Sequence, residues 1–518
     1  MTERPARRWP GGPVLLALTA ALLLFRLGTV PLLGPDEPRY ARVAVEMRRS
    51  GDLVTPTLQG QPWLEKPILY YWLAAAAFAA LGENETAARL PSVVAGVLFV
   101  GATAFIGWRL YGATAGLHAG FVLATAFLPF AYGRAAAMDM LLAATVTAGI
   151  GLMALVLLGL ARPRALLGAA AFFALATLAK GPLGVVLPAL VAGGYLVSTH
   201  DREAARRLLS PAAAAVFVAG ALPWYALILR AQGRTFVDVF LLDHNLARFT
   251  SEIHRHPGPP YYYVPVLLVG LFPWSGFVLP ALGAVRPRLH RVDVFVLLWL
   301  AVPFAFFSAA GAKLPGYILP CFAPAALLIG RAAEAIVKRQ PFPPGTGARA
   351  AALLNFAVAA AAAVFLWSEG QAALPLAAWV LLTTWLSSRR LERDPAGALA
   401  ILRVGGAGFL LLLALSAPPL LARRESGRDL FLPAARRPVL AWGAWRTAWM
   451  AGLFYNDGQV REVAALPEVL EVTRGGPALV LCGPAECRVL TKTPSLRTQL
   501  LAEGPRSNAL MRVERVTD

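Results

Sequence analysis

Carboxylate, lysine and arginine side chains gather in a few short segments of an otherwise apolar chain. The first segment, GPDEPRYA, holds Asp36 and Glu37, followed by Arg39 and Tyr40. A carboxylate can accept a proton from a nucleophile or orient it. Lysine and arginine can hold a phosphate through charge-assisted hydrogen bonds and stabilise negative charge as that phosphate leaves. Later segments supply the same kinds of group, at Glu65, Lys66, Arg89, Arg134, Asp139, Lys180, Asp243, His244, Arg248, Lys313 and Tyr317.

The composition of the chain indicates a membrane protein. Of the 518 residues, 58% are hydrophobic and 15% are charged, and the mean hydropathy is +0.60. Soluble cores stop growing at about 250–300 residues, so the surplus of apolar side chains must face lipid. The net charge of +19 comes from short basic clusters between apolar runs. Such clusters are typical of cytoplasmic loops, so we reject nucleic-acid binding.

The apolar segments and the loop charges together predict thirteen membrane spans. With the N-terminus in the cytoplasm, the basic clusters all become cytoplasmic only if segment 66–82 does not cross. Tyr70, Tyr71 and Trp72 near its start are typical of an interfacial helix. We therefore expect this segment to lie in the outer interface and the C-terminal tail to be outside. The segments long enough to be candidates are 12–30, 66–82, 87–108, 113–132, 138–161, 165–180, 182–199, 211–230, 262–283, 291–311, 314–334, 351–368, 371–388 and 400–422.

This topology places the polar segments together at the outer face. Ionisable groups at membrane depth cost roughly 2.5–3.5 kcal/mol each on insertion scales, so their concentration at one face predicts a shared polar cavity. A cavity with both carboxylates and cations suits the displacement of a sugar from a lipid phosphate. The lipid tail would lie in the bilayer and the phosphate in the cavity.

The composition changes after residue 423, which predicts two domains. Residues 1–423 would form the membrane domain, and residues 424–518 would form a small α/β domain outside the membrane. Segments 477–482 and 487–491 alternate with turn residues and predict short strands, while 458–470 predicts an amphipathic helix. Cys482 and Cys487 can pair if the tail faces an oxidising compartment.

The order of the motifs resembles a known family. LLGPDEPRYA, QPWLEKPILYYW, LGENETAARLPS, AAAMDMLL, LAKGPLG, FPWS and KLPGYILP follow one another along the first 320 residues. They resemble the polytopic C-type glycosyltransferases that use polyprenyl-phosphate sugars. Among these, the lipid A aminoarabinose transferases are most similar, and the protein O-mannosyltransferases are more distant. In the tail, GLFYNDGQV is also similar to the outer domain of the aminoarabinose transferases.

The resemblance implies roles for individual residues. It implies that Asp36 is the essential carboxylate, acting as base or orienting group, and that Asp139 is a second functional carboxylate. It also implies that Lys66 and Arg248 bind the carrier phosphate. The segment DHNLARF, which contains Arg248, departs from the family pattern by one more residue between its histidine and arginine.

Further positions complete the predicted site. Tyr40 and Tyr317 are expected to line the cavity, and Arg39 and Arg89 are further candidate ligands of the carrier phosphate. Glu65 and His244 match positions at which relatives can hold a divalent metal such as zinc. A second departure from the family pattern is Trp63, where relatives often have tyrosine.

The resemblance implies transfer of a sugar, 4-amino-4-deoxy-L-arabinose, from undecaprenyl phosphate to lipid A at the periplasmic face of the bacterial inner membrane. Such a modification is associated with polymyxin resistance. The expected partners are the polyprenyl-phosphate donor, lipid A or another envelope glycan, and membrane lipids, with the chain as a monomer. The cofactor that the motifs leave open is a divalent metal such as zinc near Glu65 and His244, which could neutralise phosphate or only brace the loops.

Three alternatives remain open at this point. The acceptor could be a protein hydroxyl, as in O-mannosyltransferases. A transporter or flippase is disfavoured, because transporters often contain internal repeats and broken helices at the midplane, and no repeat is evident. A membrane scaffold would have no special need for Asp36. At that position, Asp36 and Glu37 could also simply cap a helix, since carboxylates are favoured at helix N-termini.

Overall fold

The computed structural model describes residues 11–247, 258–283, 291–338, 346–368, 374–391 and 393–516. These residues form two compact units. The helical unit comprises Met1–Phe25, Leu64–Tyr70 and Ser92–Ala414. The mixed unit comprises Arg26–Trp63, Tyr71–Pro91 and Leu415–Asp518. Three helices, α3 (Leu69–Leu81), α4 (Glu85–Tyr111) and α20 (Pro395–Glu425), contribute residues to both units.

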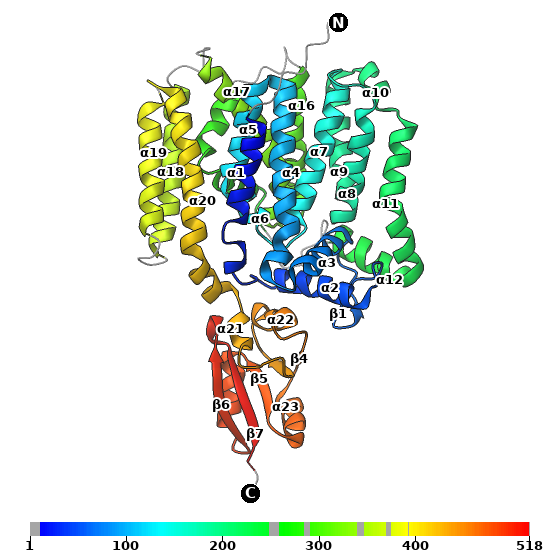
Figure 1. Ribbon diagram of the computed structural model, residues 1–518, viewed down its shortest axis with the longest axis vertical. Coiled ribbons are helices and arrows are strands. Elements are labelled where there is room, and N and C mark those ends of the chain that lie inside the picture. The colour runs from blue at the N-terminus through cyan, green and yellow to red at the C-terminus, as the bar shows by residue number, and fades with distance from the viewer. Residues whose placement is uncertain are drawn as a thin grey trace. The chain divides into compact units, whose positions relative to one another are not determined.

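Long apolar helices running side by side make up the helical unit (Figure 1). Besides its parts of α3, α4 and α20, its elements are α1 (Gly12–Leu24), α5 (Ala113–Thr125), α6 (Phe127–Gly133), α7 (Asp139–Leu157), α8 (Ala165–Lys180), α9 (Leu183–Thr199), α10 (Arg202–Leu208), α11 (Pro211–Gln232), α12 (Arg234–Phe236), η2 (Val237–Ala247), α14 (Tyr263–Gly270), η3 (Ser275–Phe277), α15 (Val278–Gly283), α16 (Arg291–Ala309), η4 (Pro315–Cys321), α17 (Phe322–Val337), α18 (Thr346–Ser368) and α19 (Leu374–Arg390).

The lengths of the helices establish a multi-span membrane protein. Among the residues that the structure describes, seven helices are long and apolar enough to cross a membrane, or up to nine if each of two bent pairs is one span. Further apolar helices of 10–17 residues include α8 and α9. Helix α3 has 13 residues, which is about 20 Å of helix, whereas the hydrocarbon core is about 30 Å thick. Its length is consistent with the interfacial position predicted for segment 66–82.

Two of the predicted spans are broken, and in each a proline explains the break. Segment 113–132 divides into α5 and α6, which are bent by 64° at the extended residue Ala126. Segment 262–283 divides after α14, with a bend of 117°. Pro129 and Pro273 lie in or beside these breaks, and proline removes a helical hydrogen bond and clashes with the carbonyl four residues earlier.

Close contacts at glycines hold α4, α5 and α17 together. A Cβ atom at Gly116 of α5 would lie 2.4 Å from the carbonyl oxygen of Ala104 and from the backbone nitrogen of Trp108, both in α4. At Gly330 of α17, it would lie 2.5 Å from the carbonyl oxygen of Ala115. Small residues let helix backbones approach in this way where no hydrophobic effect drives association in lipid.

The mixed unit is built around a five-stranded sheet. The strand order is β4-β3-β5-β7-β6; β3 is parallel to β4 and β5, and β7 is antiparallel to β5 and β6. Figure 1 shows the long red strands β6 and β7 at the end of the chain. The elements wholly in this unit are η1 (Leu27–Thr29), α2 (Asp36–Ser50), β1 (Thr57–Leu58), β2 (Gln61–Pro62), α21 (Arg428–Phe431), β3 (Val439–Trp442), α22 (Arg446–Tyr455), β4 (Val460–Val463), α23 (Leu466–Val472), η6 (Thr473–Gly475), β5 (Ala478–Cys482), α24 (Pro484–Lys492), β6 (Leu496–Glu503), η7 (Pro505–Ser507) and β7 (Ala509–Arg515).

The sheet buries apolar side chains on both faces. Along β5, Leu479 and Leu481 pack in one cluster with Ala448 and Leu453 of α22. Val480 points to the other cluster, which contains residues of α23 and α24. This alternation follows from the two-residue period of a strand.

Two local predictions for this region are wrong. Segment 487–491 is not a strand but part of helix α24, because Pro484 at its start and Lys492 in its last turn suit the two ends of a helix. Segment 458–470 is not one helix but strand β4 followed by α23. The strand predicted at 477–482 is present as β5. Cys482 and Cys487 form a disulfide.

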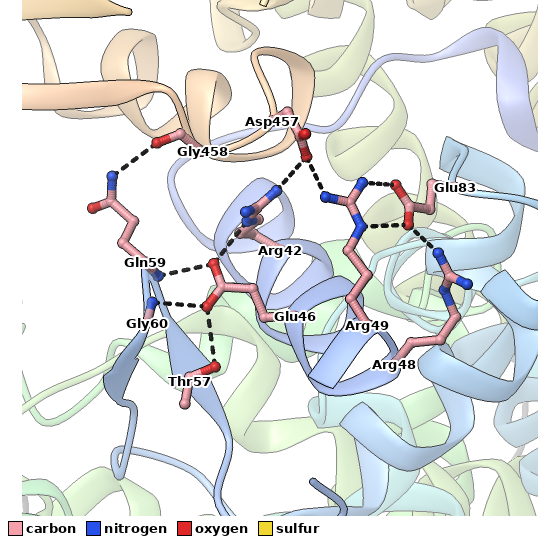
Figure 2. A network of polar contacts seen from close by, with 10 residues as sticks. All are labelled: Arg42, Glu46, Arg48, Arg49, Thr57, Gln59, Gly60, Glu83, Asp457 and Gly458. Atoms are coloured by element: carbon pink, nitrogen blue, oxygen red, sulfur yellow. Dashed lines mark hydrogen bonds and ion pairs between the residues drawn. The ribbon is translucent and has the colours of Figure 1, made fainter. Parts of the chain in front are cut away.

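A network of ion pairs connects α2 with the turn after α22 (Figure 2). Asp457 Oδ1 accepts hydrogen bonds from Arg42 Nη1 at 2.6 Å and from Arg49 Nη1 at 2.7 Å. Arg49 also pairs with Glu83 at 2.7 Å, and Arg48 pairs with the same carboxylate. The helix is therefore held to two segments that are distant in the sequence.

The network lowers the pKa of two carboxyl groups. Burial tends to raise the pKa of Asp457, but hydrogen bonds from Arg42 and Arg49 outweigh it and bring the pKa below its ordinary value. The pKa of Glu83 is lowered in the same way, with burial opposed by hydrogen bonds from Arg49 and Arg48. A lowered pKa stabilises the folded state above the ordinary value, and this stabilisation is lost as the pH falls through the lowered value.

We expect Asp457→Asn to lower the melting temperature of the full-length protein in detergent at pH 7, by about 1–2 °C for such partly exposed pairs. The difference from wild type should shrink as the pH falls below about 4, where the wild-type carboxylates also become protonated. Glu514→Gln is the matched control, because its pair with Arg512 is long, at 3.6 Å, and exposed. A difference of equal size at pH 7 and pH 3 would contradict this account.

Candidate functional site

Helix α2 presents Asp36 at its first position, with the side chain 53% exposed. Arg39 Nη2 donates a hydrogen bond to Asp36 Oδ1 at 2.5 Å. The guanidinium of Arg39 is itself buried, with its centre 5.2 Å from the Tyr40 ring and 4.9 Å from the Trp63 ring. The aromatic rings thus hold the arginine, and the arginine orients an accessible carboxylate.

Glu37, the neighbouring carboxylate, has a different environment. Its Oε2 accepts a hydrogen bond from the backbone nitrogen of Leu33 at 2.6 Å and pairs with Arg89 Nη2 at 2.6 Å. Both partners of this ion pair are buried. Leu33 precedes α2, so Glu37 holds the segment that leads into the helix and this hydrogen bond does not cap the helix itself.

The structure favours a structural role for Arg89 over the predicted phosphate contact. Its side chain is 3% exposed, and its donors reach the carbonyl oxygens of Leu27, Val30 and Pro31 at 2.6–3.1 Å. A phosphate would have to displace these partners and break a buried ion pair. Arg134 is similar, since its Nη1 donates to the carbonyl oxygens at the end of α1.

In the helical unit, the second carboxylate begins helix α7. Asp139 Oδ1 accepts a hydrogen bond from Lys180 Nζ at 2.5 Å, and the two side chains are 20% and 14% exposed. Lys180 ends α8, and its Nζ lies 4.6 Å from the centre of the Tyr317 ring. Two helix ends and the turn η4 therefore bring a carboxylate, an ammonium and a phenol together.

A cavity of about 320 Å³ lies in this unit, and one part of its wall is polar. Glu65, Lys66, Lys180, His244 and Tyr317 supply the polar groups. The remaining wall is apolar and consists of Pro67, Pro182, Leu183, Val186, Phe240, Leu241, Phe306, Phe307, Ala310 and Ala312. Cationic groups next to an extended apolar surface suit an amphiphile with an anionic head.

The two residues predicted as metal ligands lie near each other. His244 Nε2 lies 3.7 Å from Glu65 Oε1. Within the described ranges, no three His, Cys, Asp or Glu side chains come together as a group that could hold a metal ion. Zinc in proteins is bound by three or four protein ligands, and this pair would supply two of them, so the predicted metal stays a prediction.

The structure brings together most of the predicted residues within their own units. Glu65, Lys66, His244 and Tyr317 share the cavity wall, and Asp139 pairs with a further wall residue. The first loop, residues 31–86 between the first two predicted spans, contributes Asp36, Arg39 and Tyr40. These three residues lie close together in the sequence of α2, in the mixed unit. Arg248 lies outside the described residues.

Lys180 is the cavity residue that the predicted site lacked. The lysine in AKGPLG is the last residue of α8. Lysines at helix ends commonly extend toward water for solubility alone, so the sequence position does not separate the two roles. A signal was present in the following Gly181-Pro182, which ends the helix and turns the chain along the cavity.

Comparison with known proteins finds similarity to transferases whose names describe lipid-linked sugars. Residues 65–226 match the family described as dolichyl-phosphate-mannose-protein mannosyltransferase. The chain is 35% identical over 365 residues to an undecaprenyl phosphate-alpha-4-amino-4-deoxy-L-arabinose arabinosyl transferase of Pseudomonas aeruginosa PAO1, covering 66% of this chain and 64% of that protein. The predicted resemblance is confirmed. A Proteus mirabilis transferase of the same description, numbered 2, is 33% identical over 341 residues, covering 62% and 59%. The chain thus spans somewhat less than two thirds of the length of these relatives.

A solved structure extends the comparison to the fold of nearly the whole chain. ArnT from Cupriavidus metallidurans, crystallised with undecaprenyl phosphate, superposes with a TM-score of 0.80 and 23% identity. The match covers 97% of each chain, and the apo crystal structure of the same protein matches equally well. This likeness shows a common fold.

Proposed function

We propose that this protein transfers 4-amino-4-deoxy-L-arabinose from undecaprenyl phosphate to lipid A. The observation that carries the proposal is the cavity in which Lys66, Lys180 and Tyr317 adjoin an apolar wall. A polyprenyl phosphate combines an anionic head with an apolar chain, and the two parts of the wall match these two parts. The names of the similar proteins support the choice of sugar and carrier.

The chemical step is a displacement at the anomeric carbon of the sugar. An oxygen of the acceptor forms the new bond, the bond from that carbon to the carrier phosphate breaks, and its electron pair leaves with the phosphate. Cations such as Lys66 and Lys180 would stabilise the charge on the departing phosphate. No redox partner is required.

Asp36 would orient the acceptor or accept its proton. If the acceptor is a phosphate of lipid A, it is already anionic and needs orientation more than deprotonation. If it is a hydroxyl, its proton must be removed as the bond forms, and Asp36 would take it. The exposed carboxylate held by Arg39 supports either role. Asp139 would act through Lys180, keeping its ammonium in place beside Tyr317.

The second candidate is transfer of a lipid-linked sugar to a protein hydroxyl. The observation in its favour is the match of residues 65–226 to the mannosyltransferase family. Both reactions use a polyprenyl-type phosphate donor and differ in the acceptor, so the first test below must include both acceptors.

We further propose thirteen membrane crossings, with residues 1–423 as the membrane domain and 424–518 as a periplasmic domain of an inner-membrane protein. Two observations support this: the order of basic and polar segments along the sequence, and the disulfide Cys482–Cys487, since disulfides persist in oxidising compartments. The predicted monomer remains a prediction.

The transfer reaction itself is the first test. Membranes that contain wild type, lipid A and secreted protein should add aminoarabinose to lipid A when supplied with the labelled undecaprenyl-phosphate aminosugar, as detected by mass spectrometry. Asp36→Asn at equal expression should lower the rate by about 100-fold or more, as expected for loss of a general base or of an orienting carboxylate. Asp52→Asn is the matched control in the same loop, because Asp52 only accepts backbone hydrogen bonds from Val54 and Thr55.

Two outcomes of this assay would contradict the proposal. Unchanged lipid A together with newly labelled glycoprotein would favour the second candidate. Full activity of Asp36→Asn would overturn the role given to this carboxylate.

Carrier binding tests the cavity without requiring turnover. Lys180→Met should weaken binding of undecaprenyl phosphate by about tenfold or more, because a charge-assisted contact contributes about 1.5–3 kcal/mol. Binding can be followed by calorimetry in detergent. Lys338→Met is the matched control, since Lys338 also pairs with a carboxylate but is 55% exposed. Equal affinity of the Lys180 variant and wild type would remove this lysine from the phosphate site.

Cysteine labelling tests the proposed topology. In a Cys321→Ala background, a membrane-impermeant maleimide should label Asp52→Cys and Arg461→Cys from the periplasmic side. It should label Arg164→Cys only after the inner membrane is opened. All three native residues are exposed, so absence of labelling would not be due to burial. Labelling of Arg164→Cys from outside would contradict the thirteen-span arrangement.

A further inference from the structure

The turn Tyr455-Asn456-Asp457-Gly458 follows α22 and belongs to the motif GLFYNDGQV, which the proposed reaction does not use. The turn has an unusual backbone, with φ of 55° at Asp457 and 78° at Gly458. Asn456 is fully buried, and its Nδ2 donates to the carbonyl oxygens of Arg437 and Gln459 at 2.8 Å. This shape presents Tyr455 and Asp457 to the first loop within the same mixed unit.

Tyr455 makes two hydrogen bonds, one near each end of the first loop. Its hydroxyl accepts from the backbone nitrogen of Leu32 at 2.7 Å and donates to Glu85 Oε1 at 3.0 Å. Burial raises the pKa of Tyr455, so the hydroxyl keeps its proton and can serve both partners. Leu32 is fully buried, and its N–H group has no access to water.

Three consecutive backbone amides in the segment before Asp36 each donate a hydrogen bond. Leu32 donates to Tyr455, Leu33 donates to Glu37, and Gly34 donates to the carbonyl oxygen of Glu425 at 2.8 Å. Two of these three acceptors come from the last hundred or so residues of the chain. The C-terminal part of the mixed unit therefore determines the path of the chain immediately before the proposed catalytic carboxylate.

The same turn also holds the helix that begins with Asp36. Asp457 accepts hydrogen bonds from Arg42 and Arg49, on α2 (Figure 2). The carbonyl oxygen of Gly458 accepts from Gln59 Nε2 at 3.1 Å. A side chain at Gly458 would meet Arg42, because a Cβ atom there lies 2.8 Å from Arg42 Nη2. The turn thus contacts α2 and the two segments on either side of it.

We propose that Tyr455 is a positioning residue for Asp36, acting through the Leu32–Gly34 segment. The proposal rests on the proposed function, in which Asp36 contacts the acceptor. Removing the hydroxyl would leave a buried N–H group without its acceptor, and the segment would move to satisfy it. Displacements of about 1 Å at a reacting group can cost about 100-fold in rate, so even a small shift would slow turnover.

The test compares Tyr455→Phe with wild type in the full-length protein. We expect kcat for aminoarabinose transfer to fall by about tenfold or more, with the affinity for undecaprenyl phosphate unchanged within about twofold. A variant that merely contained less folded protein would lose donor-binding sites and activity in proportion. The rate is therefore expressed per donor-binding site. Tyr261→Phe is the matched control, because the Tyr261 side chain is 69% exposed.

Hydrogen–deuterium exchange provides a readout that does not depend on the reaction. In Tyr455→Phe, the amides of residues 27–36 should exchange at least about tenfold faster than in wild type, while those of α7 should not change. Faster exchange together with slower turnover per donor-binding site supports the proposal. Unchanged exchange, or faster exchange with a wild-type kcat, overturns it. If wild type transfers no aminoarabinose, the proposed function fails, and unchanged exchange at 27–36 would then overturn the positioning claim independently.

Discussion

The buried ion pair between Glu37 and Arg89 is the constraint on which the first loop depends. Two buried charges lose their hydration, so the pair is stable only when every remaining donor finds a partner. Arg89 meets this condition by donating to the carbonyl oxygens of Leu27, Val30 and Pro31. The loop must therefore follow one path, and that path leaves Asp36 at the exposed end of α2. Glu37 thus helps to fix the path of the loop, whereas the neighbouring Asp36 remains exposed and available for the proposed reaction.

A second ion pair lies beside the cavity in the helical unit, and it is less buried than the first. Asp139 and Lys180 also form an ion pair, but their side chains are partly exposed and adjoin a space of about 320 Å³. An ammonium that is held by a carboxylate and faces an open cavity can still contact an arriving phosphate. Arg89 has no such opening. Exposure of the pair, more than the presence of the charge, distinguishes a binding group from a structural one.

The sequence predicted several of the apolar helices because apolar runs are local signals. The predicted segment 165–180 coincides with α8. Pro129 and Pro273 can be seen in the sequence, but the sequence does not show whether a proline bends a span or divides it. In the C-terminal part, segment 487–491 was assigned to a strand because a short apolar run has little periodicity to separate helix from strand.

The partners of individual side chains were less predictable. The cluster of Glu65, Lys66 and Tyr317 was expected from the family motifs, and the cavity joins them. Arg89 was expected to contact phosphate, since nothing local indicates that its partners are carbonyl groups some 60 residues earlier. A guanidinium has the same charge in either setting, so its role depends on the path of the backbone around it.

Long-range hydrogen bonds link the C-terminal part of the mixed unit to the proposed reaction. The Tyr455 hydroxyl and the Leu32 amide are separated by 423 residues, a distance over which no sequence periodicity carries information. Tyr455 is the last residue of α22, which packs against α2, so its hydroxyl reaches the segment that leads into α2. A domain that only recognised an acceptor would have no need to bind the backbone before Asp36. Its hydrogen bonds to Leu32 and Gly34 instead make the geometry of the proposed catalytic carboxylate depend on the fold of the C-terminal sheet.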